Sequence, residues 1–235
     1  MTLKYVISTE TDPYRNLAME TDLMRYVTKD ASILFLWQNE NTIVIGRNQD
    51  PLKECKKDEF LASGGRIARR MSGGGAVFHD TGNLCFSILS NNVNVNEMTY
   101  QKLISRTLEE YGLESEFNGR NDLTYQGRKF SGNAVYDKGD ILCQHGTALV
   151  DVDIKKMEYY LTPEQSKFDR NHVSSIASRV VNLSEVSSSI TVDKLRESLI
   201  RANGAKKMEY TPERGGYEKM VGFYSSRKWI YGGIK

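Results

Sequence analysis

The segment from Arg69 to Asp80 reads RRMSGGGAVFHD and joins two apolar stretches through three consecutive glycines. Glycine allows positive φ angles and a close approach of backbone N–H groups to a ligand, an arrangement that suits phosphate or carboxylate oxygens. Arg70 places a fork-shaped cation beside the same turn. The segment is not a Walker loop, because no Gly-Lys-Ser/Thr closes it, and it is not a dinucleotide fingerprint, because no G-x-G-x-x-G opens a helix. It predicts an anion-binding turn, with a turn that binds nothing as the alternative.

Two further polar clusters lie downstream. Lys129 follows a turn glycine and precedes Ser131-Gly132. We expect its ammonium at the start of a strand, directed into a cleft; the alternative is a solvated surface charge, the usual state of lysine. The third cluster, QHGT from Gln144 to Thr147, puts His145 inside an apolar strand, where a histidine is more often a hydrogen-bonded core residue than a catalyst.

The chain of 235 residues fits one domain, because compact domains usually run to about 100 to 200 residues and no Gly/Ser-rich or charge-block linker divides it. Capping signals and helical spacing of apolar residues predict helices from Pro13 after the N-cap Asp12, from Asp50 to about Ser63, from Glu97 to about Tyr111 and from Thr191 to Ala202. Runs of β-forming residues predict a hairpin of Ile33–Trp37 with Thr42–Ile45, and strands at Arg66–Arg69, Ala76–Phe78, Leu84–Leu89, Leu113–Phe117, Asp122–Tyr125, Lys129–Tyr136 and Ile141–Val150. Strands in the middle of the chain with helices around them indicate an α+β domain on mixed or antiparallel sheets.

The charge balance excludes some classes of partner. Thirty-two Lys and Arg against 30 Asp and Glu leave a net charge of +2, so we expect no nucleic acid as the main partner. The longest apolar runs are far shorter than the roughly 20 residues that span a bilayer, so we expect no membrane helix. The N-terminus lacks the pattern of an export signal, which predicts a cytoplasmic protein. Cys55, Cys85 and Cys143 have no paired spacing and fit reduced thiols.

Taken together, the three clusters resemble the lipoate-protein ligase A family. The matching segments are RRMSGGGAVFHDTGNLCFS (69–87), GRNDLTYQGRKFSG (119–132) and QHGTALV (144–150). The resemblance implies the biotin/lipoate-protein ligase (class II synthetase-like) fold, a mixed β-sheet core flanked by helices, over a single catalytic domain of residues 1–235. It also implies a reaction in two steps. Lipoate and Mg-ATP give lipoyl-AMP and pyrophosphate, and a lysine of an apo carrier domain then takes the lipoyl group as an amide.

The resemblance assigns roles to individual residues. Lys129 matches the lysine that bridges the lipoate carboxylate and the α-phosphate, which makes it the expected catalytic residue. Asp122 is the expected contact of Mg²⁺. Trp37 matches a lipoate-binding position, and the alternative is that it only packs in the core. The implied ATP-binding residues are Arg70, Gly75, Ala76, Val77, Phe78, Asn121, Asp122 and Lys129, and the implied lipoate-binding residues are Glu20, Trp37, Ser72, Gly74, His79, Lys129 and His145.

The chain departs from the family pattern at two points. Cys143 stands where many members have an aromatic residue, two positions before His145-Gly146, so we expect more room in the acyl pocket. Typical bacterial members continue into an accessory domain, whereas this chain stops shortly after Trp229. We therefore expect the accessory domain to be absent, and either supplied as a separate polypeptide, removed, or not needed. The implied carrier partner is a glycine-cleavage H protein or an E2 lipoyl domain.

Three other functions are weighed against the ligase. An octanoyl or lipoyl transferase of the same fold passes the acyl group through a cysteine and uses no ATP, but the stretch Ser115–Gln126, where such a nucleophile would lie, contains no cysteine. A biotin ligase would carry a Gly-Arg-Gly-Arg type loop, which is absent. A non-catalytic module that binds lipoate or the carrier would need neither Arg70 nor Lys129. The sequence thus favours the ATP-dependent ligase.

Overall fold

The computed structural model describes residues 2–94, 99–118, 121–162 and 179–232. Its strands are β1 (Thr2–Ile7), β2 (Ala31–Trp37), β3 (Thr42–Ile45), β4 (Arg66–Arg69), β5 (Val77–His79), β6 (Asn83–Asn91), β7 (Glu116–Phe117), β8 (Asp122–Tyr125), β9 (Arg128–Asp137), β10 (Ile141–Leu149) and β11 (Lys206–Lys207). They form an eight-stranded sheet, ordered β11-β1-β2-β6-β10-β9-β8-β7, and a three-stranded sheet, ordered β4-β3-β5. In the large sheet β1 runs parallel to β2 and β11, and the other pairs are antiparallel. The predicted α+β class with a mixed sheet is confirmed.

The described helices are α1 (Pro13–Leu23), α2 (Pro51–Glu54), α3 (Lys57–Ala62), α4 (Tyr100–Glu109), α5 (Ile154–Tyr160), α6 (Leu183–Val186), α7 (Val192–Ala202), α8 (Arg214–Ser225) and α9 (Arg227–Tyr231), with 3₁₀ turns at Met24–Tyr26 and Asn92–Asn94. Three of them, α1, α2 and α7, begin after the capping residues that the sequence indicates, Asp12, Asp50 and Thr191. The side chain of Asp12 accepts hydrogen bonds from two N–H groups in the first turn of α1, and Thr191 accepts one in α7. Both side chains satisfy N–H groups that have no partner within the helix. The predicted helix start at Glu97 lies outside the described residues, and the described helix begins at Tyr100.

The predicted helix from Asp50 to Ser63 is broken in the middle. Cys55 is extended, with φ −156° and ψ 161°, and forms an isolated antiparallel bridge with Leu161. The N–H of Lys56 donates to the carbonyl oxygen of Tyr160 at 2.9 Å. Because the backbone here pairs with a distant segment, the local helical preference yields two short helices, α2 and α3.

The predicted hairpin of β2 with β3 is wrong. β2 pairs with β1 and β6 in the large sheet, whereas β3 pairs with β4 and β5 in the small one. All seven residues of β2 are buried, so this strand has neighbours on both edges and covered faces, a position that its local sequence does not distinguish from a hairpin arm. The connection crosses from one sheet to the other, and Asn16 secures it by donating to Gln38 O and Asn39 Oδ1 at 2.9 and 3.1 Å.

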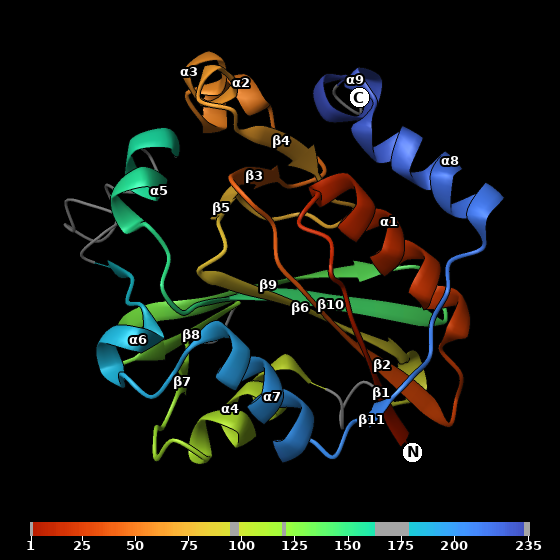
Figure 1. The fold of residues 1–235 in the computed structure, drawn as a ribbon, viewed down its shortest axis with the longest axis vertical. Helices are drawn as coiled ribbons and strands as arrows, with labels where there is room; N and C mark the ends of the chain where they lie inside the picture. Colours follow the sequence, from red (N-terminus) through yellow and green to blue (C-terminus); the bar gives the residue numbers. More distant parts are fainter. Residues whose placement is uncertain (1, 95–98, 119–120, 163–178, 233–235) are drawn as a thin grey trace.

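The large sheet separates two hydrophobic cores. In Figure 1, α4 and α7 lie on one face of this sheet, and α1 lies with the small sheet on the other. Alternate residues of β2 point to opposite faces: Phe35 and Trp37 belong to the core on the α1 side, and Leu34 and Leu36 to the core under α4 and α7. Among the described residues no helix is both long enough and apolar enough to cross a membrane.

The guanidinium of Arg69 attaches the last helix to the small sheet. Arg69 is 1% exposed and donates to the carbonyl oxygens of Trp229 at 2.9 Å and Ile230 at 2.6 Å. It also donates to three carbonyl oxygens in the loop after β3, of Gly46, Arg47 and Gln49. The indole Nε1 of Trp229 returns a hydrogen bond to the carbonyl of Arg69 at 2.8 Å. A buried guanidinium is tolerated here because its N–H groups meet backbone oxygens.

We expect Arg69→Leu to lower the free energy of unfolding by about 3 kcal/mol or more, since hydrogen bonds to a charged group contribute about 1.5–3 kcal/mol each and the substitution leaves buried carbonyl oxygens unpaired. Denaturant titration measures the loss. Arg66→Leu on the same strand is the matched control, because Arg66 makes an exposed ion pair with Asp12 at 3.6 Å and such pairs contribute about 1 kcal/mol at most. Equal losses in the two variants would contradict the role given to Arg69.

Candidate active site

The side chain of Arg70 organises the glycine turn between β4 and β5. Its Nε donates to Ser72 Oγ at 3.0 Å, its Nη2 to the carbonyl oxygens of Gly73 and Gly75 at 2.7 and 2.8 Å, and its Nη1 to a carbonyl of β3 at 3.1 Å. Gly74 has φ +91°, and a Cβ there would stand 2.8 Å from Nη2 of Arg70. Glycine is therefore required by both the backbone angle and the guanidinium. Of the five N–H donors of arginine, one on Nη1 stays without a partner among the described residues.

A cavity of about 220 Å³ lies between the two sheets and takes its wall from both. Part of the wall consists of buried side chains, among them Leu17, Trp37 and Val44. Another part carries the charged groups of Asp122 and Lys129, whose side chains are 30% and 39% exposed. The cavity thus combines buried apolar side chains in its interior with a charged, accessible mouth, as expected for a ligand that has an apolar body and a polar end.

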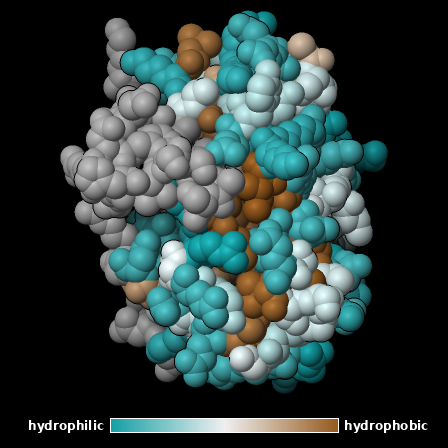
Figure 2. Space-filling view, turned by 90° about the vertical axis from the view of Figure 1, so that its left-hand side faces the viewer, coloured by the Kyte–Doolittle hydropathy of each residue, from teal (hydrophilic) through white to brown (hydrophobic). Residues whose placement is uncertain are grey.

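A second cavity, of about 250 Å³, adjoins the first. Its further lining is largely apolar and includes Phe78, Met157 and Leu161. It shares six lining residues with the first cavity: Gly75, Ala76, Val77, Lys129, Gly132 and Thr147. Figure 2 shows the left-hand side of Figure 1, where α5 lies, and on this face a band of hydrophobic residues is visible between polar ones.

Lys129 belongs to the wall of both cavities. It is the second residue of β9, and its Nζ lies 2.8 Å from Oδ1 of Asp122 on the neighbouring strand β8. A Cβ on Gly132 would stand 2.8 Å from this Nζ, so the glycine leaves space for the ammonium. The ammonium stands at the start of a strand and faces a cleft, as the sequence predicts.

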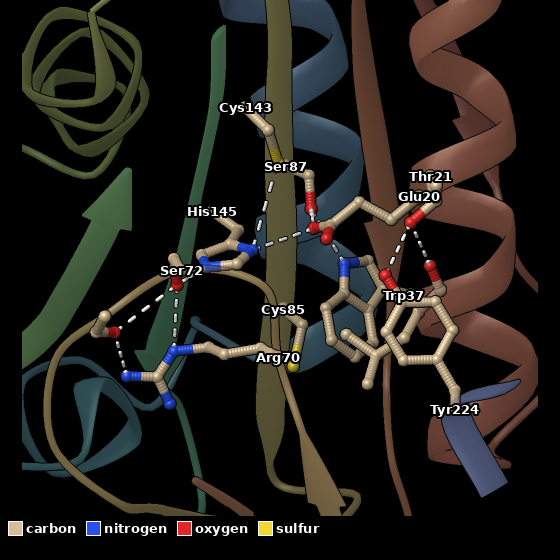
Figure 3. A network of polar contacts seen from close by, with 12 residues as sticks. Glu20, Thr21, Trp37, Arg70, Ser72, Cys85, Ser87, Cys143, His145 and Tyr224 are labelled. Atoms are coloured by element: carbon tan, nitrogen blue, oxygen red, sulfur yellow. Dashed lines mark hydrogen bonds and ion pairs between the residues drawn. The ribbon is translucent and has the colours of Figure 1, made fainter. Parts of the chain in front are cut away.

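A buried polar network lies next to the first cavity (Figure 3). Glu20 on α1, 5% exposed, accepts from Ser87 Oγ at 2.5 Å and lies 3.0 Å from Nδ1 of His145 on β10. Nε2 of the same imidazole lies 2.5 Å from Ser72 Oγ, the hydroxyl that Arg70 also contacts. These contacts connect helix α1, strand β10 and the glycine turn, which are far apart in the sequence.

The environment of Glu20 favours its ionised form. Burial alone would raise the pKa of this carboxyl, but His145 beside it and the hydrogen bonds from His145, Ser87 and Cys143 more than offset burial and hold the pKa below its usual value. Glu20, Cys143 and His145 place donor atoms within 4.8 Å of one another, a spacing that a metal ion also accepts. The hydrogen bonds among these groups account for their proximity.

The sequence-predicted residues fall into three groups. Most of those predicted to contact ATP or lipoate line the first cavity: Trp37, Arg70, Gly74, Gly75, Ala76, Val77, His79, Asn121, Asp122, Lys129 and His145. Phe78 lines only the second cavity. Glu20 and Ser72 are not among the described lining residues of either cavity, although both touch His145.

Other residues of the site were not singled out from the sequence. Leu17, Val44 and Thr147 line the first cavity, and only Thr147 lies in a motif that drew attention. Ser87, which bonds Glu20, looks like any polar residue of a strand. Cys143 stands behind His145, with Sγ 3.9 Å from Nδ1, and is not among the described lining residues, so the expected widening of the acyl pocket at this position has no counterpart in the cavity wall.

His79 is a neutral donor in the cavity wall. Burial, followed by the charges of Arg70 and His145, lowers its pKa to about 3. Its Nδ1 lies 3.2 Å from Nδ2 of Asn39, and because that amide donates, Nδ1 accepts and Nε2 carries the proton. Nε2 is itself buried and has no partner among the described residues, so this N–H is an unsatisfied donor on a residue that lines the first cavity.

Residues 12–203 match the family described as the lipoyl protein ligase A/B catalytic domain. The match covers most of the chain, which therefore belongs to this family. A curated relative, the lipoate-protein ligase A of Blochmanniella floridana, is 42% identical over an aligned region of 195 residues, with 81% of this chain and 58% of that protein covered. The chain thus spans little more than half the length of this relative.

Solved structures of lipoate-protein ligases share the fold. LipL1 of P. falciparum, in complex with lipoate, has a TM-score of 0.82 and 30% identity, with 99% of this chain and 75% of that chain covered. A bi-partite lipoate protein ligase from Thermoplasma acidophilum, described with its E2 lipoyl domain, has a TM-score of 0.82 and 24% identity, with 100% and 97% covered. The lipoate-protein ligase fold that the sequence predicts is confirmed.

We expect the free energy of unfolding to decrease as the pH falls below 6.5, and we expect His79 to cause part of this decrease. Its pKa of about 3 in the folded chain lies below the ordinary value of 6.5, so the unfolded chain takes up the proton first as the pH falls. The stability that neutral His79 contributes is complete above about pH 6.5 and is lost toward pH 3, at about 1 kcal/mol per pH unit. Unfolding free energies at pH 6 and pH 5 for the wild type and His79→Gln measure this: the variant should show the shallower dependence, and parallel curves would contradict the assignment.

Proposed function

We propose that the chain catalyses the ATP-dependent attachment of lipoate to a lysine of an apo carrier domain. A carboxylate oxygen of lipoate attacks the α-phosphorus of ATP and pyrophosphate leaves, giving lipoyl-AMP. The carrier amine then attacks the acyl carbon, AMP leaves with the bonding electrons, and the amine loses a proton to form the amide. The observation that carries this proposal is the place of Lys129, whose ammonium lines two adjoining cavities.

The first cavity suits lipoate. Its buried wall at Leu17, Trp37 and Val44 accommodates an apolar chain. At the mouth the ammonium of Lys129 can bind the carboxylate. Residues that stabilise charge in the transition state act most strongly where water is excluded, and this wall of buried side chains provides such surroundings.

The second cavity suits the nucleoside of ATP. Its lining is largely apolar, and it meets the first cavity at Lys129 and at the turn residues Gly75 to Val77. A phosphate placed at this junction would be within reach of Lys129 and of the open Nη1 of Arg70. Burial lowers the pKa of Arg70 to about 10, so the guanidinium stays charged at neutral pH.

Asp122 is the residue that would hold Mg²⁺. Magnesium takes oxygen ligands and is usually bound by one or two carboxylates together with phosphates and water. Asp122 offers a partly exposed carboxylate in the cavity wall, next to Asn121, so the residues present fit the ion. Bound there, Mg²⁺ would neutralise charge on the phosphates.

The cysteines argue against the transferase alternative. A nucleophilic cysteine needs an accessible, readily ionised thiol. Cys55, Cys85 and Cys143 are buried free thiols, and none of them is a described lining residue of either cavity. Burial raises the pKa of Cys55 to about 11 and raises the pKa values of Cys85 and Cys143 well above the ordinary value. A purely binding module would need no ammonium between two ligand cavities.

The partner that follows is a lipoyl carrier, either a glycine-cleavage H protein or an E2 lipoyl domain, and the named E2 partner of the Thermoplasma ligase supports this class. A separate accessory polypeptide is a second partner in the proposal. The proposal also includes the cytoplasmic location that the sequence predicts.

We expect Lys129→Ala to lower the rate of lipoylation at least about 10²-fold, since a donor aimed at charge developing in the transition state contributes about this much. The assay follows the mass of an apo lipoyl domain incubated with enzyme, lipoate and Mg-ATP, together with pyrophosphate release. Lys138→Ala is the control, because Lys138 is exposed at the turn after β9 and is not in the lining of either cavity.

If the wild type is inactive, assays with two acyl sources, lipoate plus ATP and preformed lipoyl-AMP, distinguish a missing accessory polypeptide from a wrong assignment of function. Transfer from chemically made lipoyl-AMP, without transfer from lipoate and ATP, would indicate that an accessory polypeptide is needed for activation. No transfer from either acyl source would contradict the proposed function, as would full activity of Lys129→Ala.

A further inference from the structure

Two branches of hydrogen bonds in the buried network lead to the carboxylate of Glu20 (Figure 3). An ionised carboxylate only accepts hydrogen bonds, and an indole N–H only donates. Ser87 therefore donates its O–H to Glu20 at 2.5 Å and accepts from Nε1 of Trp37 at 3.2 Å. Each bond on this branch, Trp37 to Ser87 to Glu20, has only one possible direction.

The other branch has the same property when Glu20 is ionised and the imidazole of His145 is neutral. Nδ1 of His145 carries a proton, because it lies 3.0 Å from Oε1 of Glu20. A neutral imidazole then offers Nε2 as an acceptor, so Ser72 donates its O–H to Nε2 at 2.5 Å. The oxygen of Ser72 in turn accepts the Nε–H of Arg70 at 3.0 Å. The direction along this branch is from Arg70 through Ser72 and His145 to Glu20.

Glu20 lies outside the described lining of the ligand cavities, whereas Arg70, at the other end of this branch, lines the first cavity. Glu20 and Ser72 are not among the described lining residues, but His145 and Arg70 are. The guanidinium of Arg70 also holds the carbonyl oxygens of Gly73 and Gly75. A change in the hydrogen bonding of Ser72 is therefore transmitted to the glycine turn.

We propose that Glu20 is a positioning residue, which selects the Nδ1–H form of His145 and thereby holds Ser72, Arg70 and the glycine turn in the conformation that binds ATP. The consequence for catalysis rests on the proposed function. The proposal replaces the lipoate contact that the sequence resemblance implies for Glu20 with an action through His145.

The first test needs no variant and no turnover. Long-range ¹H–¹⁵N NMR spectra report which ring nitrogen of a histidine carries the proton, and His145→Gln assigns the signals. We expect His145 of the wild type to be protonated on Nδ1 and not on Nε2 at neutral pH. A proton on Nε2 would overturn the proposal whatever the enzyme turns out to catalyse.

The second test compares two replacements of Glu20. Both Ser87 and His145 bond the same oxygen, Oε1, so the side-chain carbonyl of Glu20→Gln can take its place, whereas Glu20→Leu offers no acceptor. We expect Glu20→Leu to lose the Nδ1–H preference and to raise the KM for ATP in pyrophosphate release by about tenfold, the cost of one lost buried hydrogen bond. Glu20→Gln should retain the preference and stay within about threefold of the wild type.

Asp22→Asn is the matched control, because Asp22 is a second buried carboxylate of α1 whose partners are Arg25 and Tyr210, outside the network. It should leave the protonation of His145 and the KM for ATP unchanged. Equal defects in Glu20→Leu and Glu20→Gln, or an effect on the KM for lipoate alone, would overturn the positioning role. A wild type that transfers lipoate from neither acyl source, but whose His145 carries the proton on Nδ1, would contradict the proposed reaction and leave the hydrogen-bond assignment intact.

Discussion

Two neighbouring guanidinium groups, those of Arg69 and Arg70, hold the loops on which both cavities depend. Arg69 is the last residue of β4 and Arg70 follows it. Arg69 reaches the carbonyl oxygens of the last helix, and Arg70 reaches those of the glycine turn. Burying such a cation is unfavourable unless its N–H groups find acceptors. Backbone carbonyl oxygens supply them here, which ties two loops and helix α9 to the edge of the small sheet.

The ligand cavity exists because the strands form two separate sheets and not a single continuous one. β2 and β3 follow each other in the sequence but enter different sheets, and the space between these sheets becomes the ligand cavity. Its wall therefore combines β2, β9 and β10 of the large sheet with β3 and β5 of the small one. Neither sheet alone would bring Trp37 and His79, whose ring centroids lie 6.1 Å apart, against the same space.

Local signals in the sequence were sufficient for most elements and for the residues of the three motifs. Glycines, capping residues and a lysine at the start of a strand have consequences within a few residues, and these consequences appear in the structure. The hairpin of β2 with β3 and the continuous helix from Asp50 failed for the opposite reason. Both depend on pairing with distant segments, such as the bridge from Cys55 to Leu161, that leave no mark on the local pattern.

The buried network shows the same limit within the site. Glu20 and His145 are separated by 125 positions in the chain, and nothing near either residue indicates the other. A family resemblance assigns both to the ligand pocket, but it cannot tell a residue that touches the ligand from one that acts through a neighbour. That distinction depends on which atoms line the cavity, and therefore on coordinates.

Lys129 and Asp122 form a partly exposed ion pair, with 2.8 Å between Nζ and Oδ1, at the mouth of the cavity. An anion can bind there only by exchanging with the carboxylate of Asp122. Any anion that binds the ammonium has to compete with the carboxylate already there. Once displaced, that carboxylate becomes a free negative charge beside the newly bound anion, and it attracts a cation. The site therefore favours ligands that arrive as an anion together with its counterion, and it disfavours an anion that arrives alone.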